Sequence, residues 1–137
     1  MLSTEELKNY IYREIQPKLG NISYSNLYFE EGTNCSIEGT YIFSKNNKYH
    51  ILFTEKGKIK SDIVTSDERE VLWNALKTLS IKIIMDFAIQ NREKGKDFRR
   101  NLFAKEIEIF SLFGTDFEKR KVKEIEDILK NNPYHDT

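Results

Sequence analysis

The chain has 137 residues, which is enough for one domain with a hydrophobic core and too few for two large domains. Charged residues make up 32% and apolar residues 39%, as in an ordinary soluble globular protein. Lys and Arg number 22, as do Asp and Glu, so the formal net charge is zero and the composition excludes an overall basic protein drawn to nucleic acid or an acidic membrane.

Residues 1–20 are predicted to form an N-terminal helix. Ser3 and Glu6 have the spacing of a capping box, in which each side chain accepts a hydrogen bond from the backbone of the other residue. Gly20 is a natural helix stop, and Pro17 favours a bend or an early end in the last turn. The apolar residues on one face are Leu7, Tyr10, Ile11 and Ile15.

Residues 21–65 change to a period of two and predict a small antiparallel sheet of three to four strands. The segments GTYIFSK and YHILFT are rich in aromatic and β-branched residues, which is typical of strands. The short polar segments KNNK and EKGK that follow them predict tight hairpin turns. One face of this sheet is expected to pack against the rest of the chain.

Residues 66–134 are predicted to form a layer of three helices. The first runs from about residue 66 to residue 91, after a second capping box of Thr65 and Glu68, and its wide apolar arc indicates a central helix. Gly95 lies in the break that follows. Strands followed by helices favour an α+β fold, and we expect residues 1–137 to form a single domain.

Two charged residues interrupt the apolar face of the segment KDFRRNLFAKEIEIFSLFG (96–114). At about 100° per residue, Arg99 and Glu106 fall inside the arc of apolar side chains. An unpaired buried guanidinium would cost several kcal/mol, so Arg99 should have a carboxylate partner. Asp86 on the preceding helix is the first candidate, and Glu106 is the second. The apolar residues of the arc are Phe98, Leu102, Phe103, Ile109, Phe110 and Phe113.

This interruption has two interpretations. A local rule broken at one place is typical of functional or strained sites, so Arg99 with Asp86 or Glu106 is a site candidate. The alternative is a structural ion pair that fixes how two helices cross. A helix that begins near Asp97 would also place Arg99 and Arg100 in its first turn, where cations oppose the helix dipole.

The sequence offers little conventional chemistry. The two histidines, His50 and His135, have no second ligand at zinc spacing, and no glycine-rich phosphate loop precedes a helix, so no metal or cofactor is expected. A nucleophilic pair of Cys35 and His50 stays an open alternative, as does an enzyme built on Arg99 and a carboxylate. His50 is more simply a half-buried strand or interface residue.

The cellular context is expected to be the cytoplasm. Cys35 is the only cysteine, so no intramolecular disulfide can form. The start MLSTEELKNY lacks the basic and apolar regions of a signal peptide. No stretch approaches the roughly 18 uninterrupted apolar residues of a membrane-spanning helix.

The later part of the chain resembles the immunity protein 63 family, small bacterial proteins of polymorphic toxin loci. The resemblance covers Tyr49 to Tyr134. Its elements are Tyr49–His50, FTEKGK, Asp86–Phe87, Arg92, Asp97–Phe98–Arg99–Arg100, Leu102–Phe103, Glu124–Ile125, Ile128–Leu129 and Pro133–Tyr134.

This resemblance implies a non-enzymatic cytoplasmic protein that binds and neutralises a cognate toxin domain. Residues of the turn NREKGKDFRR are candidates for the partner-binding surface, with a basic patch that meets an acidic partner. These candidates are Arg92, Lys94, Lys96, Asp97 and Arg100. The alternative is a nucleic-acid or anionic-ligand binding module that uses the same patch and the run Lys119 to Lys123, although that run is more simply a solvated helix face.

Overall fold

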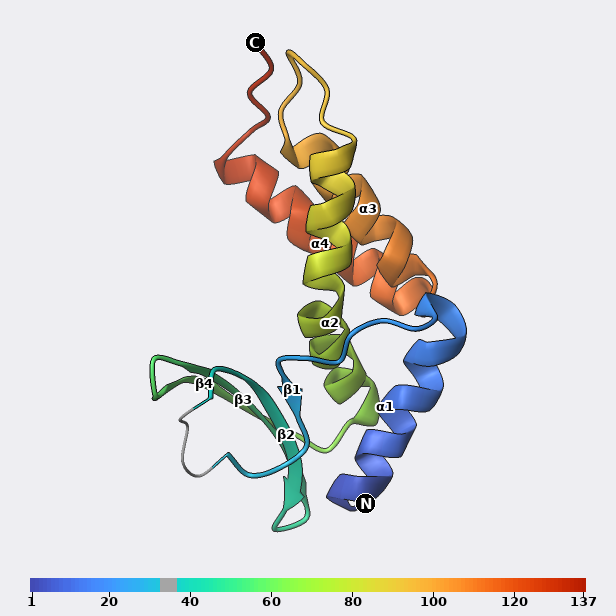
Figure 1. Cartoon of the computed structure of the whole chain (residues 1–137), viewed down its shortest axis with the longest axis vertical. Helices are drawn as coiled ribbons and strands as arrows, with labels where there is room; N and C mark the ends of the chain where they lie inside the picture. Colours follow the sequence, from blue (N-terminus) through green and yellow to red (C-terminus); the bar gives the residue numbers. More distant parts are fainter. Residues whose placement is uncertain (33–36) are drawn as a thin grey trace. The chain divides into compact units, whose positions relative to one another are not determined.

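The computed structural model describes residues 1–32 and 37–137 and confirms the predicted α+β fold (Figure 1). Cys35 lies outside the described residues. An N-terminal helix precedes four strands and three helices: α1 (Thr4–Leu19), β1 (Leu27–Tyr28), β2 (Gly39–Lys45), β3 (Lys48–Glu55), β4 (Lys58–Thr65), α2 (Glu68–Gln90), α3 (Arg99–Ser111) and α4 (Thr115–Asn131).

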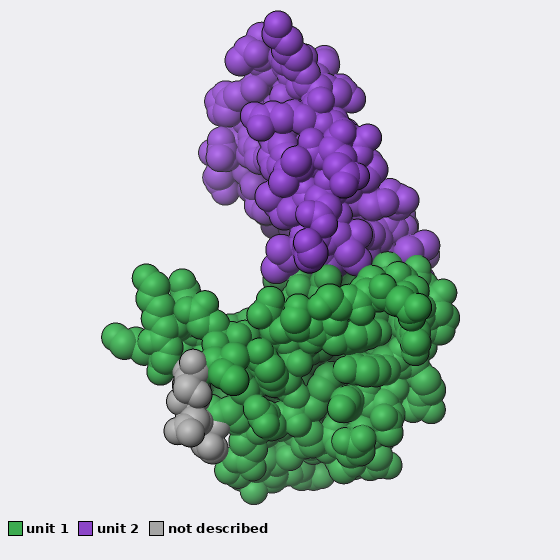
Figure 2. All heavy atoms as spheres, viewed as in Figure 1, with its two compact units in different colours: residues 1–79 green, residues 80–137 purple. Residues whose placement is uncertain are grey.

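The chain divides into two compact units, residues 1–79 and residues 80–137 (Figure 2). The division falls within α2, so one helix contributes residues to both units. The expectation that the whole chain forms a single domain stays a prediction.

Unit 1 begins with the predicted capped helix. The Oγ of Ser3 accepts a hydrogen bond from the backbone N–H of Glu6 at 3.1 Å, and the Glu6 carboxylate accepts one from the N–H of Ser3 at 2.9 Å. Both halves of the capping box are therefore present. Pro17 lies inside α1, and Gly20 terminates it with a positive φ of 71°.

The sheet has the strand order β1-β2-β3-β4. Both hairpins turn through residues with positive φ, Asn46 and Asn47 in one and Lys56 and Gly57 in the other. Two consecutive residues with positive φ make a turn whose twist matches that of the flanking strands, which explains these two sharp connections.

One pairing differs from the antiparallel prediction. β1 pairs parallel with β2, with Leu27 opposite Thr40 and Tyr28 opposite Tyr41, so the sheet is mixed. Parallel neighbours need a connection that returns the chain to the end of the strand where it began.

Both faces of the sheet carry buried side chains in unit 1. On one face, the phenol oxygen of the fully buried Tyr49 accepts a hydrogen bond from the N–H of Leu2 at 3.0 Å, and the Thr40 and Thr78 hydroxyls lie 2.8 Å apart. These contacts join the sheet to the N-terminal helix segment and to α2. The opposite face carries a separate buried cluster of Tyr41, Phe43 and Leu52, with Tyr28 packed against it.

The start of α2 differs from the predicted capping box. The Thr65 hydroxyl accepts a hydrogen bond from the N–H of Asp67, and the Asp67 carboxylate accepts one from the N–H of Arg69 at 2.9 Å. The helix begins at Glu68, so Asp67 is the residue placed to cap its first turn. Leu72, Trp73 and Leu76 on this part of α2 are buried in unit 1.

Unit 2 holds the end of α2 together with α3 and α4. The aromatic rings of Phe110, Phe113 and Phe117 pack together, with centroids 6.4–6.5 Å apart in the pairs that involve Phe117. Phe103 and Ile125 are buried in the same unit. The burial of Phe103, Phe110 and Phe113 agrees with the apolar face predicted for the segment 96–114.

Candidate functional site

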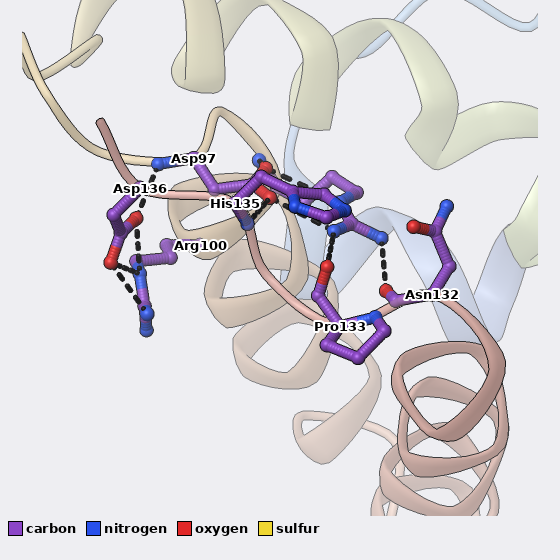
Figure 3. A network of polar contacts seen from close by, with 7 residues as sticks. Asp97, Arg100, Asn132, Pro133, His135 and Asp136 are labelled. Carbon is purple, nitrogen blue, oxygen red and sulfur yellow. Dashed lines mark hydrogen bonds and ion pairs between the residues drawn. The ribbon is translucent and has the colours of Figure 1, made fainter.

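Most of the predicted site residues lie near the loop before α3, which meets the C-terminal tail (Figure 3). The backbone N–H of Thr137 donates to the carbonyl oxygen of Gly95 at 3.0 Å. The N–H of Asp97 donates to the Asp136 carboxylate, and the N–H of His135 donates to the Asp97 carboxylate, both at 2.7 Å. The loop and the tail each donate backbone hydrogen bonds to the other, and these bonds hold the two segments together.

Asp97 is the carboxylate partner of Arg99. Its Oδ1 accepts hydrogen bonds from the backbone N–H of Arg99 at 2.9 Å and from the Arg99 Nε at 3.2 Å. Its Oδ2 accepts from the Arg99 Nη2 at 2.9 Å. The side chains of Arg99 and Asp97 are only 20% and 10% exposed. This bidentate, two-oxygen arrangement is the geometry for which a guanidinium is suited.

The same guanidinium also reaches the end of α4. The Nη1 of Arg99 donates to the carbonyl oxygen of Asn132, and its Nη2 donates to that of Pro133, each at 2.8 Å. Asn132 is the residue that caps α4, so Arg99 satisfies carbonyl groups at a helix end that carries a partial negative charge. Arg99 therefore joins the start of α3 to the end of α4.

Arg100 is held by the tail in a parallel way. Its Nε and Nη2 donate to the Asp136 carboxylate at 2.8–3.1 Å. Its guanidinium lies 4.1 Å from the centre of the Tyr134 ring, and that of Arg99 lies 5.5 Å from the same ring. The carboxylates of Asp97 and Asp136 thus offset two cations that would otherwise oppose the dipole of α3.

The charges in this network shift the acidity of both carboxyl groups. Hydrogen bonds from the Arg99 side chain, then from the N–H of His135 and of Arg99, hold the pKa of Asp97 far below its usual range. The Arg100 side chain, followed by the N–H of Asp97, lowers the pKa of Asp136 to about 2. Both carboxyl groups are therefore ionised at neutral pH.

The partners expected for Arg99 from the sequence are engaged elsewhere. Asp86 forms an ion pair with Lys82, one turn earlier on α2, at 3.3 Å. Glu106 approaches Lys121 on α4 at 3.9 Å. Asp97 takes their place because it lies two residues before Arg99, where one carboxylate can bind both the backbone N–H and the side chain of Arg99.

Lys121 is the charged residue that the sequence analysis missed. It is 5% exposed, its ammonium lies 3.2 Å from the Glu124 carboxylate, and it lies 4.3 Å from the centre of the Phe110 ring. Lys123 pairs with Asp127 at 2.9 Å. Two of the cations in the run 119–123 are thus already neutralised within the protein.

The remaining basic candidates line a shallow hollow of about 470 Å³ in unit 2. Arg92, Lys94 and Lys96 are exposed on its wall. The Arg92 guanidinium lies 5.6 Å from the centre of the Phe98 ring. Within residues 1–32 and 37–137, the ammonium groups of Lys94 and Lys96 form no ion pair. The structure therefore separates Arg100, which is bound to the tail, from three cations that face solvent.

The other sequence candidates are placed as follows. His50 is half-buried on β3, stacks on Phe43 at 4.9 Å, and its Nδ1 lies 3.7 Å from the Asp62 carboxylate. The described residues include no group of three or more histidine, cysteine or acidic side chains able to hold a metal ion. No helix in this part of the chain has the length and apolar character needed to cross a membrane.

Comparison with known proteins places these features in a family. No curated protein and no solved structure gives a significant match to the chain. The sequence model of immunity protein 63 matches residues 45–127, more than half of the chain. The match includes Asp97 in the loop before α3 and Arg99 and Arg100 in the first turn of α3, and it stops before the tail that binds them. The chain therefore belongs to the immunity protein 63 family, as its resemblance predicted.

Proposed function

We propose that this protein is a non-enzymatic bacterial immunity protein, which binds a cognate toxin domain in the cytoplasm and neutralises it. The observation that carries the proposal is membership of the immunity protein 63 family over residues 45–127. An antidote of this kind needs a surface complementary to its target and no reacting groups of its own.

We further propose that the solvent-facing cations form part of the toxin-binding surface. The term cationic loop is used below for Arg92, Lys94 and Lys96. These residues are exposed, whereas Arg99 and Arg100 are held by carboxylates. Charged groups at the rim of an interface steer association and select oppositely charged partners, so an acidic toxin surface fits this loop.

Arg99, Asp97 and Arg100 have a different role in this proposal. They bind one another, the tail and the end of α4, so they fix the conformation of the loop instead of contacting the toxin directly. Asp86 and Glu106 have a structural role in this proposal. Asp86 pairs with Lys82 on α2, and Glu106 approaches Lys121 between α3 and α4.

The test is a binding measurement with a catalytically inactive variant of the toxin domain that is encoded beside this gene. Calorimetry should show one-to-one binding by the wild-type protein, and co-expression should protect cells from the active toxin. The double variant Arg92→Glu, Lys94→Glu should bind at least about tenfold more weakly. Lys119→Glu reverses an exposed charge on α4 and is the matched control, with affinity expected to stay within about threefold of wild type.

The nucleic-acid alternative predicts a different result. Binding to phosphates would weaken steeply as salt increases, because each neutralised phosphate releases counterions. Lys121 and Lys123, which that alternative needs, are bound to carboxylates. A single-stranded DNA oligonucleotide should therefore show no tight binding at moderate salt, and strong salt-dependent binding would favour the alternative over toxin neutralisation.

A further inference from the structure

Unit 2 exposes an apolar ridge along the end of α2. Ile81, Met85 and Ile89 follow one another at intervals of four residues and are 60%, 37% and 60% exposed. The ridge is the name used below for these three residues. Ile84 and Ala88 on the same helix are buried, so the inward face of α2 is already supplied with apolar side chains. An additional apolar row on the solvent side is typical of an interaction surface.

The polar neighbours of the ridge leave it open. Lys82 and Asp86 form the adjacent row on α2 and pair with each other at 3.3 Å, with side chains 80% and 54% exposed. Because these two opposite charges pair with each other, the row beside the ridge has no net charge. The ridge can therefore be covered by apolar groups without burying an unpaired charge.

The ridge also leads directly to the cationic loop. Ile89 precedes Arg92 by three positions, and three residues span at most about 11 Å even when fully extended. Arg92 and the two lysines that follow it are exposed on the wall of the hollow described above. An apolar row and a cluster of exposed cations thus lie next to each other along the chain within unit 2.

We infer that the ridge is the apolar half of the toxin-docking surface, and that its occupant is an amphipathic helix of the toxin domain with acidic residues at one end. A row of side chains at four-residue intervals fits the groove of a second helix at the commonest crossing angle of globular proteins. The acidic end of that helix meets the cationic loop. The charge of the loop selects the acidic partner, and the ridge supplies the buried contact. This inference rests on the proposed function.

The experiment uses the full chain and the inactivated toxin domain encoded beside its gene. Met85→Glu and Ile89→Glu place a charge in the middle and at the end of the ridge, and each should weaken binding by about 30-fold or more. Leu112→Glu introduces the same charge at another exposed apolar residue of unit 2, 47% exposed, and should bind as the wild type does. Circular dichroism checks folding, and Ile81→Ala with Ile89→Ala is a milder second variant.

The outcomes separate the inference from the proposed function. If the wild-type protein binds the toxin and every ridge variant binds it with the same affinity, the inference is overturned and the immunity function stays in place. Absence of toxin binding and of cellular protection by the wild type overturns both. Sedimentation tests whether a second copy of this chain covers the ridge instead. A wild-type dimer that Met85→Glu converts to a monomer would show this and would overturn the inference. Exchange of acidic residues of the toxin helix for lysine should restore affinity for the Arg92→Glu, Lys94→Glu variant.

Discussion

Replacement of Phe110 by alanine tests the packing between α3 and α4. Phe110 is 1% exposed, so its whole ring leaves an apolar environment when truncated, and a cavity remains in its place. Such Phe→Ala changes cost about 3–5 kcal/mol of unfolding free energy. Since domains are stable by only about 5–15 kcal/mol, a loss of this size would take a large fraction of the total.

A second contribution comes from the buried lysine above the ring. The Lys121 ammonium lies 4.3 Å from the ring centre, and desolvated cation–π contacts are worth up to about 2 kcal/mol. Phe110→Leu retains most of the apolar volume and removes the aromatic face. A double-mutant cycle of Phe110→Leu with Lys121→Met should therefore give a coupling of about 0.5–2 kcal/mol.

Urea unfolding followed by far-ultraviolet circular dichroism measures both effects. Leu112→Ala is the control, because Leu112 is 47% exposed, and its truncation should cost no more than about 1 kcal/mol. If Phe110→Ala cost less than about 1 kcal/mol, or if the control cost as much as Phe110→Ala, the burial argument for α3 and α4 would be refuted.

Three further predictions concern the network, its acidity and the two units. The pKa of Asp136 is lowered from 3.8 to about 2, so the ionised carboxylate stabilises the fold above about pH 4, and this stabilisation is lost as the pH falls to about 2. In urea unfolding, Asp136→Asn should therefore be less stable than the wild type at pH 7, and the difference should shrink at pH 2. Arg99→Lys should lower the urea midpoint more than Arg92→Lys does, because one ammonium cannot bind a carboxylate and two carbonyl groups at the positions that the guanidinium reaches. If the chain is a single domain, the fluorescence of Trp73 in unit 1 should report the same midpoint as circular dichroism, and Phe110→Ala in unit 2 should shift both; two separate transitions would contradict this.

The elements of the fold were predictable because their signals are local. The Ser3–Glu6 capping box, the polar hairpin turns and the apolar faces of the helices each depend on residues a few positions apart. The parallel pairing of β1 was not predictable in the same way. Its two residues, Leu27 and Tyr28, carry too little pattern to specify a direction, and their partners in β2 are chosen by the packed structure.

The sequence predicted that charged residues interrupt an apolar helix face, but it did not predict which residues bind them. The sequence indicated that Arg99 needs a carboxylate, and the structure supplies Asp97 from the adjoining loop. The missing information was the return of residues 132–137 to the start of α3, which no short-range pattern encodes. Lys121 could have been recognised, because it lies four residues from both Phe117 and Ile125 on the buried face of α4.

The binding of residues 97–100 by residues 132–137 has a consequence for the order of events during synthesis. Unit 1 comprises residues 1–79, so its segments leave the ribosome long before the tail does. Arg99 meets the carbonyl groups of Asn132 and Pro133, and Arg100 meets the Asp136 carboxylate, only once residues 132–136 have left the ribosome. Nascent chains stalled within α4 should therefore have a finished sheet and a loop that the tail does not yet hold, so the loop reaches its final conformation later than the sheet does.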